Sequence, residues 1–284
     1  MKLVRYGCAG EEKPGVVDDR GEVRDLSSFV EDFGPATLSP QALQALRAIR
    51  VEELPQVSGR PRLGPPLPSV GKFVAIGLNY KDHAEEAKMA LPSEPVVFMK
   101  APTCLTGPYD DVVQPKRSTK LDWEAELGIV IGSEARSVSV GEALEHVAGY
   151  CVVNDVSERH FQLERGGTWD KGKGFDTFGP IGPYLVTRDE VGDVQRLGIW
   201  LDLNGERMQT GNTRDMIFDC ATIVSYVSEC MTMLPGDIIT TGTPPGVGMG
   251  LNPPRYLKPG DVMTLGVDKL GVQKQRVVPF TSKG

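Results

Sequence analysis

Residues 121–132 read Leu121-Asp122-Trp123-Glu124-Ala125-Glu126-Leu127-Gly128-Ile129-Val130-Ile131-Gly132, and this stretch decides the fold. Its β-branched and large apolar residues, closed by glycine, predict one β-strand. Because side chains alternate between the two faces of a strand, Glu124 and Glu126 are expected on one face, and Trp123, Ala125 and Leu127 on the other, facing a core. Two adjacent carboxylates repel each other and gain nothing from burial, so a bound cation is the simplest way to make the pair favourable.

A third carboxylate fits this pair. Asp155 directly follows the apolar run 150–154, which predicts another strand, and strand ends are common positions for ligand-binding side chains. Three carboxylates without cysteine or histidine suit a hard ion, Mg²⁺ or Mn²⁺. The alternative is that Glu124 and Glu126 lie on a solvated face and Asp155 caps a helix, and spacing leaves both interpretations open. For Asp122, on the same face, a salt bridge is expected rather than metal ligation.

The patterns around this stretch predict two domains. Residues 1–60 contain three short strands and a helix over 40–49, with Ser39 as N-cap and proline at its first position. The proline-rich stretch 60–68 marks a boundary. We therefore expect a small strand-rich N-terminal domain over 1–66 and a catalytic domain over 67–284. The larger part is predicted as an α+β, strand-rich fold, with strands over 72–77, 95–99, 147–154, 197–204, 237–241, 262–267 and 272–278 and helices over 82–90, 140–147, 157–164 and 222–231.

Composition narrows the class of protein. The 284 residues are 40% hydrophobic and 24% charged, with a net charge of -7, which is ordinary for a globular protein. The acidic balance argues against nucleic acid or an anionic membrane as the main partner. No apolar run is long enough for a transmembrane helix and no secretory leader pattern begins the chain, so a cytoplasmic location is expected. Five scattered cysteines without a CxxC motif predict neither disulfides nor a zinc site.

Two further groups could act near the carboxylates. His83 is followed three positions later by Glu86, and on a helix these side chains can touch, giving a candidate general base. An exposed surface pair is the simpler explanation of an isolated HxxE pattern. Arg159 and Gln162 share one face of the helix predicted after Asp155 and could bind a substrate carboxylate. An ordinary solvated helix face explains them equally well.

Two glycine-rich segments are candidate loops at the site. The stretch 169–176 places Lys173 among glycines, where the backbone can approach an anionic ligand closely. The stretch 240–248 contains Thr243 and could cradle a carboxylate with backbone NH groups. It lacks the lysine and spacing of a nucleotide-binding loop. Solvated or purely structural loops are the alternatives for both.

Together, five segments resemble the fumarylacetoacetate hydrolase family, and they occur in the family's order over roughly residues 70–280. They are Gly77-Leu78-Asn79-Tyr80-Lys81-Asp82-His83, Asp122-Trp123-Glu124-Ala125-Glu126-Leu127, Asn154-Asp155, Lys173-Gly174-Phe175-Asp176 and Thr241-Gly242-Thr243-Pro244. The resemblance implies a mixed β-sheet roll or barrel with short helices, a homodimer, and Mg²⁺ or Mn²⁺ held by Glu124, Glu126 and Asp155. It further implies a His83–Glu86 dyad on a lid helix and a catalytic Lys173. Substrate contacts are implied for Arg159, Gln162 and Thr243.

The resemblance points to hydrolysis of a 2,4-diketo acid, an acylpyruvate. The additional carboxylate ligand and differently placed histidine of the fumarylacetoacetate hydrolases proper are not found, so that substrate is not expected. The runs 154–162, 164–176 and 212–218 look most like bacterial enzymes that cleave 2,4-diketo-3-deoxy-L-rhamnonate or the L-fuconate equivalent to pyruvate and lactate. Oxaloacetate decarboxylation, isomerisation of 2-hydroxyhepta-2,4-diene-1,7-dioate and metal-dependent ligand binding without catalysis are the alternatives.

Overall fold

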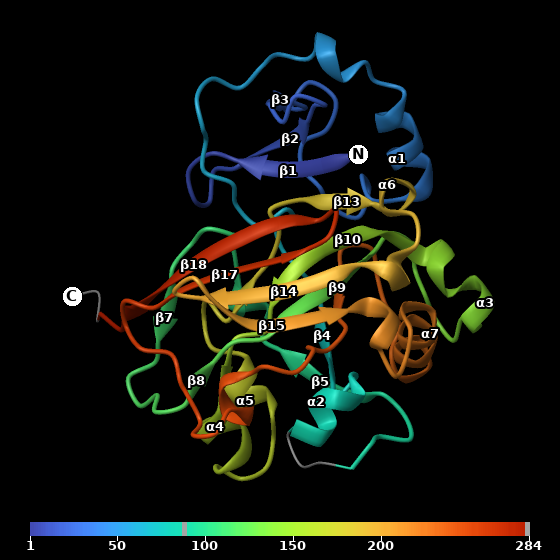
Figure 1. Ribbon diagram of the computed structural model, residues 1–284. Helices are drawn as coiled ribbons and strands as arrows, with labels where there is room; N and C mark the ends of the chain where they lie inside the picture. The colour runs from blue at the N-terminus through green and yellow to red at the C-terminus, as the bar shows by residue number, and fades with distance from the viewer. Residues whose placement is uncertain (87–89, 282–284) are drawn as a thin grey trace.

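The computed structural model describes residues 1–86 and 90–281, except for the side chains of residues 83–85. Strands dominate, and most form two sheets (Figure 1). The nine-stranded sheet contains, in spatial order, β3 (Val23–Asp25), β2 (Lys13–Val17), β1 (Lys2–Tyr6), β13 (Leu185–Thr187), β10 (Val147–Asn154), β9 (Ala125–Ile131), β16 (Ile238–Thr240), β4 (Phe73–Gly77) and β5 (Val96–Lys100). The five-stranded sheet contains β15 (Glu206–Asn212), β14 (Gly198–Leu203), β17 (Val262–Val267), β18 (Gly271–Pro279) and β7 (Val112–Gln114).

The remaining elements are short. Two two-stranded pairs join β8 (Leu121–Asp122) to β11 (Ser157–Glu158) and β6 (Leu105–Thr106) to β12 (Gly179–Pro180). The α-helices are α1 (Pro40–Arg47), α2 (Lys81–Glu86), α3 (Val140–Ala143), α4 (Arg159–Leu163), α5 (Asp170–Lys173), α6 (Arg188–Val191) and α7 (Cys220–Cys230). The predicted α+β, strand-rich class is confirmed. Within the described residues the sheets stay open, so the expected roll does not close into a barrel.

The core lies around the central strands β9 and β10. All residues of both strands are buried, and the five-stranded sheet packs beside them through β14 and β17. The antiparallel register pairs Glu126 with Val153 and Ala125 with Asn154. Strands buried on both faces read as nearly continuous apolar runs, so a carboxylate within one of them stands out as a buried charge.

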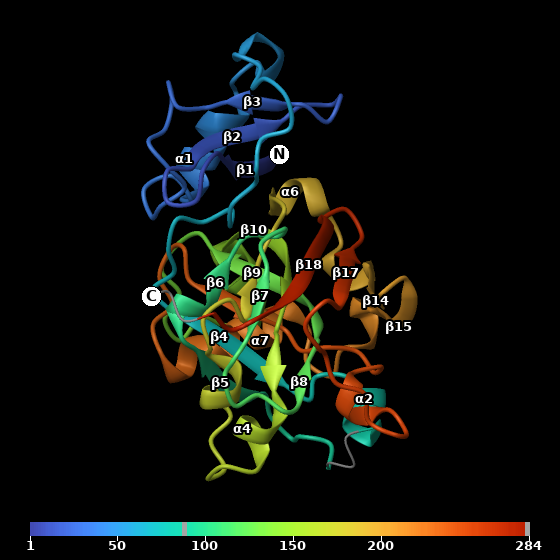
Figure 2. The same ribbon diagram turned by 90° about the vertical axis from the view of Figure 1, so that its left-hand side faces the viewer.

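The small N-terminal unit joins the large sheet directly. Strand β1 pairs antiparallel with β13, with Lys2 opposite Val186 and Leu3 opposite Leu185. Figure 2 shows β1–β3 and α1 at one end of the molecule, with α2 and α4 at the other. As predicted, the Ser39 side chain caps α1 by accepting a hydrogen bond from the Ala42 NH. A domain boundary at 66/67 stays a prediction.

Several local predictions were wrong in their boundaries. The stretch 121–132 is two strands, because Trp123 and Glu124 leave the ladder and their NH groups donate instead to the side chains of Asp122 and Asn154. This break turns β8 away to pair with β11. The helix predicted over 157–164 therefore begins only at Arg159.

Other helices also differ from the prediction. The predicted helix 140–147 changes after Ala143 into a 3₁₀ turn, and α7 begins at Cys220, after an Asp219 N-cap. Helix α2 runs over Lys81–Glu86, and residues 87–89 of the predicted helix lie outside the described residues.

The hairpin after β14 is confirmed: Asn204 and Gly205 both have positive φ, as the favoured two-residue turn requires. The cysteines are free thiols, as predicted. In the described parts of the chain, none of the helices has the length and hydrophobicity needed to cross a bilayer.

Candidate metal centre and active site

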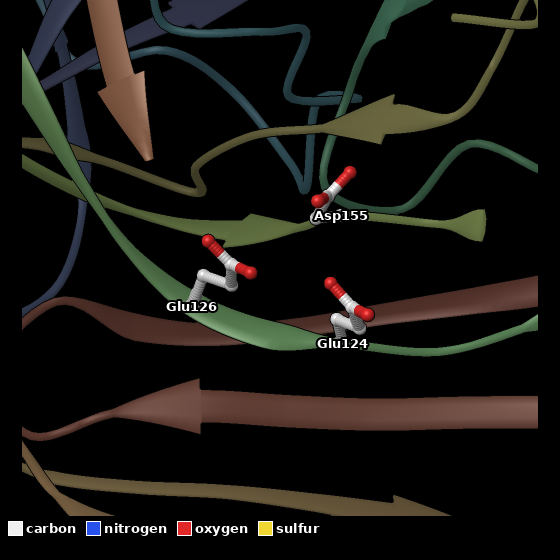
Figure 3. Close-up of side chains that lie close together, drawn as sticks. All are labelled: Glu124, Glu126 and Asp155. Atoms are coloured by element: carbon white, nitrogen blue, oxygen red, sulfur yellow. The ribbon is translucent and has the colours of Figure 1, made fainter. Parts of the chain in front are cut away.

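Glu124, Glu126 and Asp155 meet where β9 begins and β10 ends. Figure 3 shows the side chains of Glu126, on β9, and of Glu124, just before it, directed toward Asp155 on the neighbouring segment. The Asp155 NH donates to the Glu124 carbonyl across 2.9 Å, so these two residues lie opposite each other and present their side chains on one face. One carboxylate oxygen from each of the three residues lies within 4.8 Å of the others. All three side chains are buried, which excludes the solvated-face alternative.

Glu126 is anchored through one oxygen. Its Oε2 accepts hydrogen bonds from the Thr240 hydroxyl and from the Gly242 NH, the latter across 2.8 Å. Burial, with the charges of Asp155 and Glu124 added, raises the pKa of Glu126 well above its ordinary value. The protein therefore holds this side chain where its charged form needs a cation nearby.

Lys173 bridges the other two carboxylates. Its Nζ lies 2.7 Å from Glu124 Oε2 and 2.7 Å from Asp155 Oδ2, and its side chain is fully enclosed. Burial lowers the pKa of Lys173, but the charges of Asp155 and Glu124 outweigh burial and raise it. Gly172 makes this position possible, because a Cβ there would lie 2.5 Å from the Gln162 backbone NH. The predicted lysine is thus at the centre of the site as an ammonium ion.

Arg159 and Asp122 form a second buried ion pair beside the carboxylates. Arg159 Nε donates to Asp122 Oδ2 across 2.8 Å, and its Nη2 lies 2.7 Å from Glu124 Oε1. Burial lowers the pKa of Arg159, and the nearby Asp122 and Glu124 raise it overall. Asp122 also accepts hydrogen bonds from the NH groups of Gly248 and Met249. The salt-bridge interpretation of Asp122 is confirmed.

Sequence reasoning missed Lys100. Its Nζ lies 2.6 Å from Asp155 Oδ1 and also donates to the Lys173 carbonyl, and the residue is 1% exposed. The sequence did contain one indication of its role: Lys100 is the single charged residue of the strand Val96–Lys100 and stands at its end. Thr240, which holds Glu126, was also missed, because a threonine in a strand has many ordinary explanations.

The donor set fits a divalent hard cation. Four buried carboxylates, those of Asp122, Glu124, Glu126 and Asp155, face three buried cations, Lys100, Arg159 and Lys173. The described cluster thus carries an excess of one negative charge when every group is ionised. Three carboxylate oxygens converge without sulfur, which suits Mg²⁺ or Mn²⁺.

The remaining predicted substrate contacts lie close by. Gln162, with Arg159, lines a small pocket of about 40 Å³ over the carboxylates, and its Oε1 accepts a hydrogen bond from Arg159 Nη1. Thr243 lines the same pocket, but its hydroxyl donates to the Ala125 carbonyl and accepts from Gln209 Nε2. These two hydrogen bonds engage the Thr243 hydroxyl and fix it to the backbone at the start of β9. Its contact with substrate stays a prediction, as does that of Gln162.

The predicted dyad is described only in part. Glu86 accepts a hydrogen bond from the Gly246 NH across 3.0 Å and packs against Gly250, so it ties α2 to the loop after β16. That loop contributes Gly242 and Met249 to the pocket. The side chain of His83 lies outside the described residues, so its role stays a prediction.

Comparison with known proteins identifies the family. The model of the fumarylacetoacetate (FAA) hydrolase C-terminal family matches residues 72–278. A protein from Burkholderia orbicola (strain MC0-3) named as a hydrolase is 59% identical over 277 residues, covering 97% of this chain and 98% of that protein.

Solved structures agree with this match. A probable 2-hydroxyhepta-2,4-diene-1,7-dioate isomerase from Mycobacterium abscessus is 36% identical with a TM-score of 0.84, covering 99% of this chain and 100% of that one. Maleylpyruvate hydrolase from Sphingobium sp. SYK-6, in complex with manganese(II) and pyruvate, is 28% identical with a TM-score of 0.81 and the same coverage. The chain described here belongs to the fumarylacetoacetate hydrolase family, whose members include hydrolases and isomerases.

Proposed function

We propose that this protein hydrolyses the C3–C4 bond of a 2,4-diketo acid and releases pyruvate. The observation that carries the proposal is the buried Glu124–Glu126–Asp155 triad with Lys173 between two of its carboxylates. The candidate substrates are 2,4-diketo-3-deoxy-L-rhamnonate and its L-fuconate equivalent, which yield pyruvate and lactate. We also propose that the protein acts as a homodimer in the cytoplasm.

Different residues stabilise the developing charge and bind the substrate. When bound by the triad, Mg²⁺ or Mn²⁺ supplies positive charge that stabilises an enolate oxygen. Lys173 adds a second positive charge that is already desolvated, and a preorganised donor of this kind is worth about 3 kcal/mol. Arg159 and Gln162 bind and orient the substrate carboxylate at the floor of the pocket. The electrostatic part of the reaction thus rests on charges fixed before substrate arrives.

His83 is proposed as the general base, oriented by Glu86. It removes a proton from water, whose oxygen forms a bond to C4. The C3–C4 bond then breaks, its electron pair passes to pyruvate as the enolate, and protonation at C3 completes the product. The hydrogen bond from the Gly246 NH to Glu86, which ties α2 to the loop that contributes to the pocket, supports this proposal.

Pyruvate release with and without His83 tests the proposal. We expect the Mg²⁺-loaded enzyme to release pyruvate from acylpyruvates, and EDTA to stop it. His83→Gln should abolish hydrolysis while Mn²⁺ binding, followed by electron paramagnetic resonance, stays unchanged. Undiminished pyruvate release by His83→Gln would refute the base assignment.

Isomerisation of an unsaturated diacid is the second candidate, because the solved structure from Mycobacterium abscessus carries that name. Isomerisation and oxaloacetate decarboxylation both stabilise an enolate but need no attacking water. A variant at His83 that keeps full turnover of a diacid or of oxaloacetate would favour them. Tight pyruvate binding without turnover of any of these compounds would indicate a ligand-binding protein.

A further inference from the structure

The residues that line the pocket over the triad change from charged and polar at its floor to apolar at its mouth. Its floor carries the charged and polar groups described above. The rest of its described lining is largely apolar and includes Leu78, Phe98, Leu163, Trp169 and Met249. Leu163 is 42% exposed, and Trp169 and Met249 are half-buried, so these three residues lie toward the mouth. A substrate bound by its keto-acid end would direct its other end against this apolar wall.

Phe98 and Trp169, here called the aromatic corner, have fixed positions. Their rings meet edge to face with centroids 5.3 Å apart. Trp169 also packs on Gly77, where a Cβ would lie 2.4 Å from the indole ring. The Phe98 ring centroid is 5.2 Å from Lys173 Nζ, which places the apolar surface beside the ammonium group. The corner is therefore a preformed surface next to the chemistry.

The described cations of this pocket lie at its floor and not along its outer wall. Arg159 and Lys173 line it, and both contact carboxylates of the buried cluster. Arg165 and Lys171 are near in sequence but line a neighbouring groove. There the Arg165 guanidinium lies 4.4 Å from the ring centroid of Phe161. Among the described residues, the outer pocket thus offers apolar surface to a substrate and no partner for a second carboxylate.

We infer that the enzyme prefers acylpyruvates ending in a methyl or short alkyl group and discriminates against those ending in a second carboxylate. The inference rests on the proposed function and narrows its substrate class. An apolar end gains from leaving water for the aromatic corner. A carboxylate placed there loses hydration and gains no partner from the residues that the structure describes. The deoxy sugar acids proposed above end in a methyl group and therefore agree with the inferred preference.

Two matched compounds test the inference. 2,4-Dioxoheptanoate and 2,4-dioxoheptanedioate share a carbon chain and differ only in a terminal methyl or carboxylate. With the Mg²⁺-loaded enzyme we expect kcat/KM for pyruvate release to be at least about tenfold higher for the monocarboxylate, because its alkyl end gains apolar contact while the carboxylate loses part of its hydration at the pocket mouth. A ratio near one, or a preference for the diacid, overturns the inference.

A charge added at the mouth gives a second measurement. Leu163→Lys should lower the selectivity ratio at least about tenfold by raising kcat/KM for the diacid, since it supplies the missing partner. Leu234→Lys, at a residue 45% exposed that does not line this pocket, adds the same charge and should leave the ratio unchanged. Equal effects of the two variants would show that overall charge sets the ratio and overturn the assignment to the pocket wall. Release of pyruvate from neither compound overturns the proposed function itself, whereas rapid release from both overturns only the inference.

Discussion

Replacing Lys100 with methionine tests the buried charge cluster most directly. Methionine approximates the lysine stem in length and volume, so the change removes mainly the ammonium group. That group lies 2.6 Å from Asp155 Oδ1 and also donates to the Lys173 carbonyl, and the residue is 1% exposed. Because no solvent reaches the vacated position, neither acceptor can replace its lost donor with bulk water.

The expected loss of stability is large. Removing one partner of a buried ion pair costs about 3–5 kcal/mol. Lys173 still pairs with Asp155 Oδ2 across 2.7 Å, so we expect a loss near the lower end of this range. Lys120→Met is the matched control, since Lys120 forms an ion pair with Glu164 in which the side chains are 35% and 50% exposed. An exposed pair contributes about 0.2–1 kcal/mol, so this variant should unfold nearly as the parent does.

Urea unfolding in EDTA measures both variants. A loss for Lys100→Met below about 1 kcal/mol, or one equal to that of Lys120→Met, would refute the assignment of Lys100 as a charge partner of Asp155. A second readout uses the metal. Without Lys100 the described cluster has an excess of two negative charges instead of one, so added Mn²⁺ should stabilise Lys100→Met more than the parent protein. Equal stabilisation by Mn²⁺ would contradict this charge count.

Three further predictions concern the same protein. First, burial raises the pKa of Asp110 and of Glu12, but hydrogen bonds and nearby positive charge, led by the hydrogen bond from Arg62, together outweigh burial and lower both pKa values. The stability that these two carboxylates contribute is present above their unfolded pKa values of 3.8 and 4.5 and is lost at lower pH. The urea midpoint should therefore fall between pH 7 and about pH 3, and less steeply in Asp110→Asn; identical slopes would refute the linkage. Second, in EDTA the raised pKa of Glu126 favours the folded state below the unfolded value of 4.5 and loses that contribution as pH rises. Stabilisation by Mn²⁺ should accordingly be larger at about pH 8 than at about pH 6, and calorimetry showing the reverse would contradict the coupling. Third, Thr240→Val removes a donor to Glu126 and should weaken Mn²⁺ binding about tenfold. Thr241→Val, whose hydroxyl donates to the Leu127 carbonyl, is the control, and equal effects would argue against a specific role of Thr240.

The fold could be predicted where the signal was local. The alternation of charged and apolar residues placed Glu124 and Glu126 on one face, and Ser39 before a proline marked the start of α1. The break after Asp122 was not predictable, because Trp123 and Glu124 have ordinary strand propensities. Their NH groups leave the ladder for side chains, one of them Asn154, thirty residues away. Side-chain competition of this kind depends on the partner segment and leaves no local pattern.

The candidate site, like the fold, could be predicted from the sequence only in part. The sequence by itself determined which ligand types were available, and three carboxylates among apolar residues indicated a hard cation. Only the tertiary structure decided that Asp155 lies opposite Glu124, because register depends on the packing of whole strands. It also decided that Lys100, Arg159 and Lys173 converge on these carboxylates from β5, α4 and α5. Side-chain periodicity acts over a few residues and can be read along the chain. The balance of buried charge is a sum over distant segments, and it exists only once they pack together.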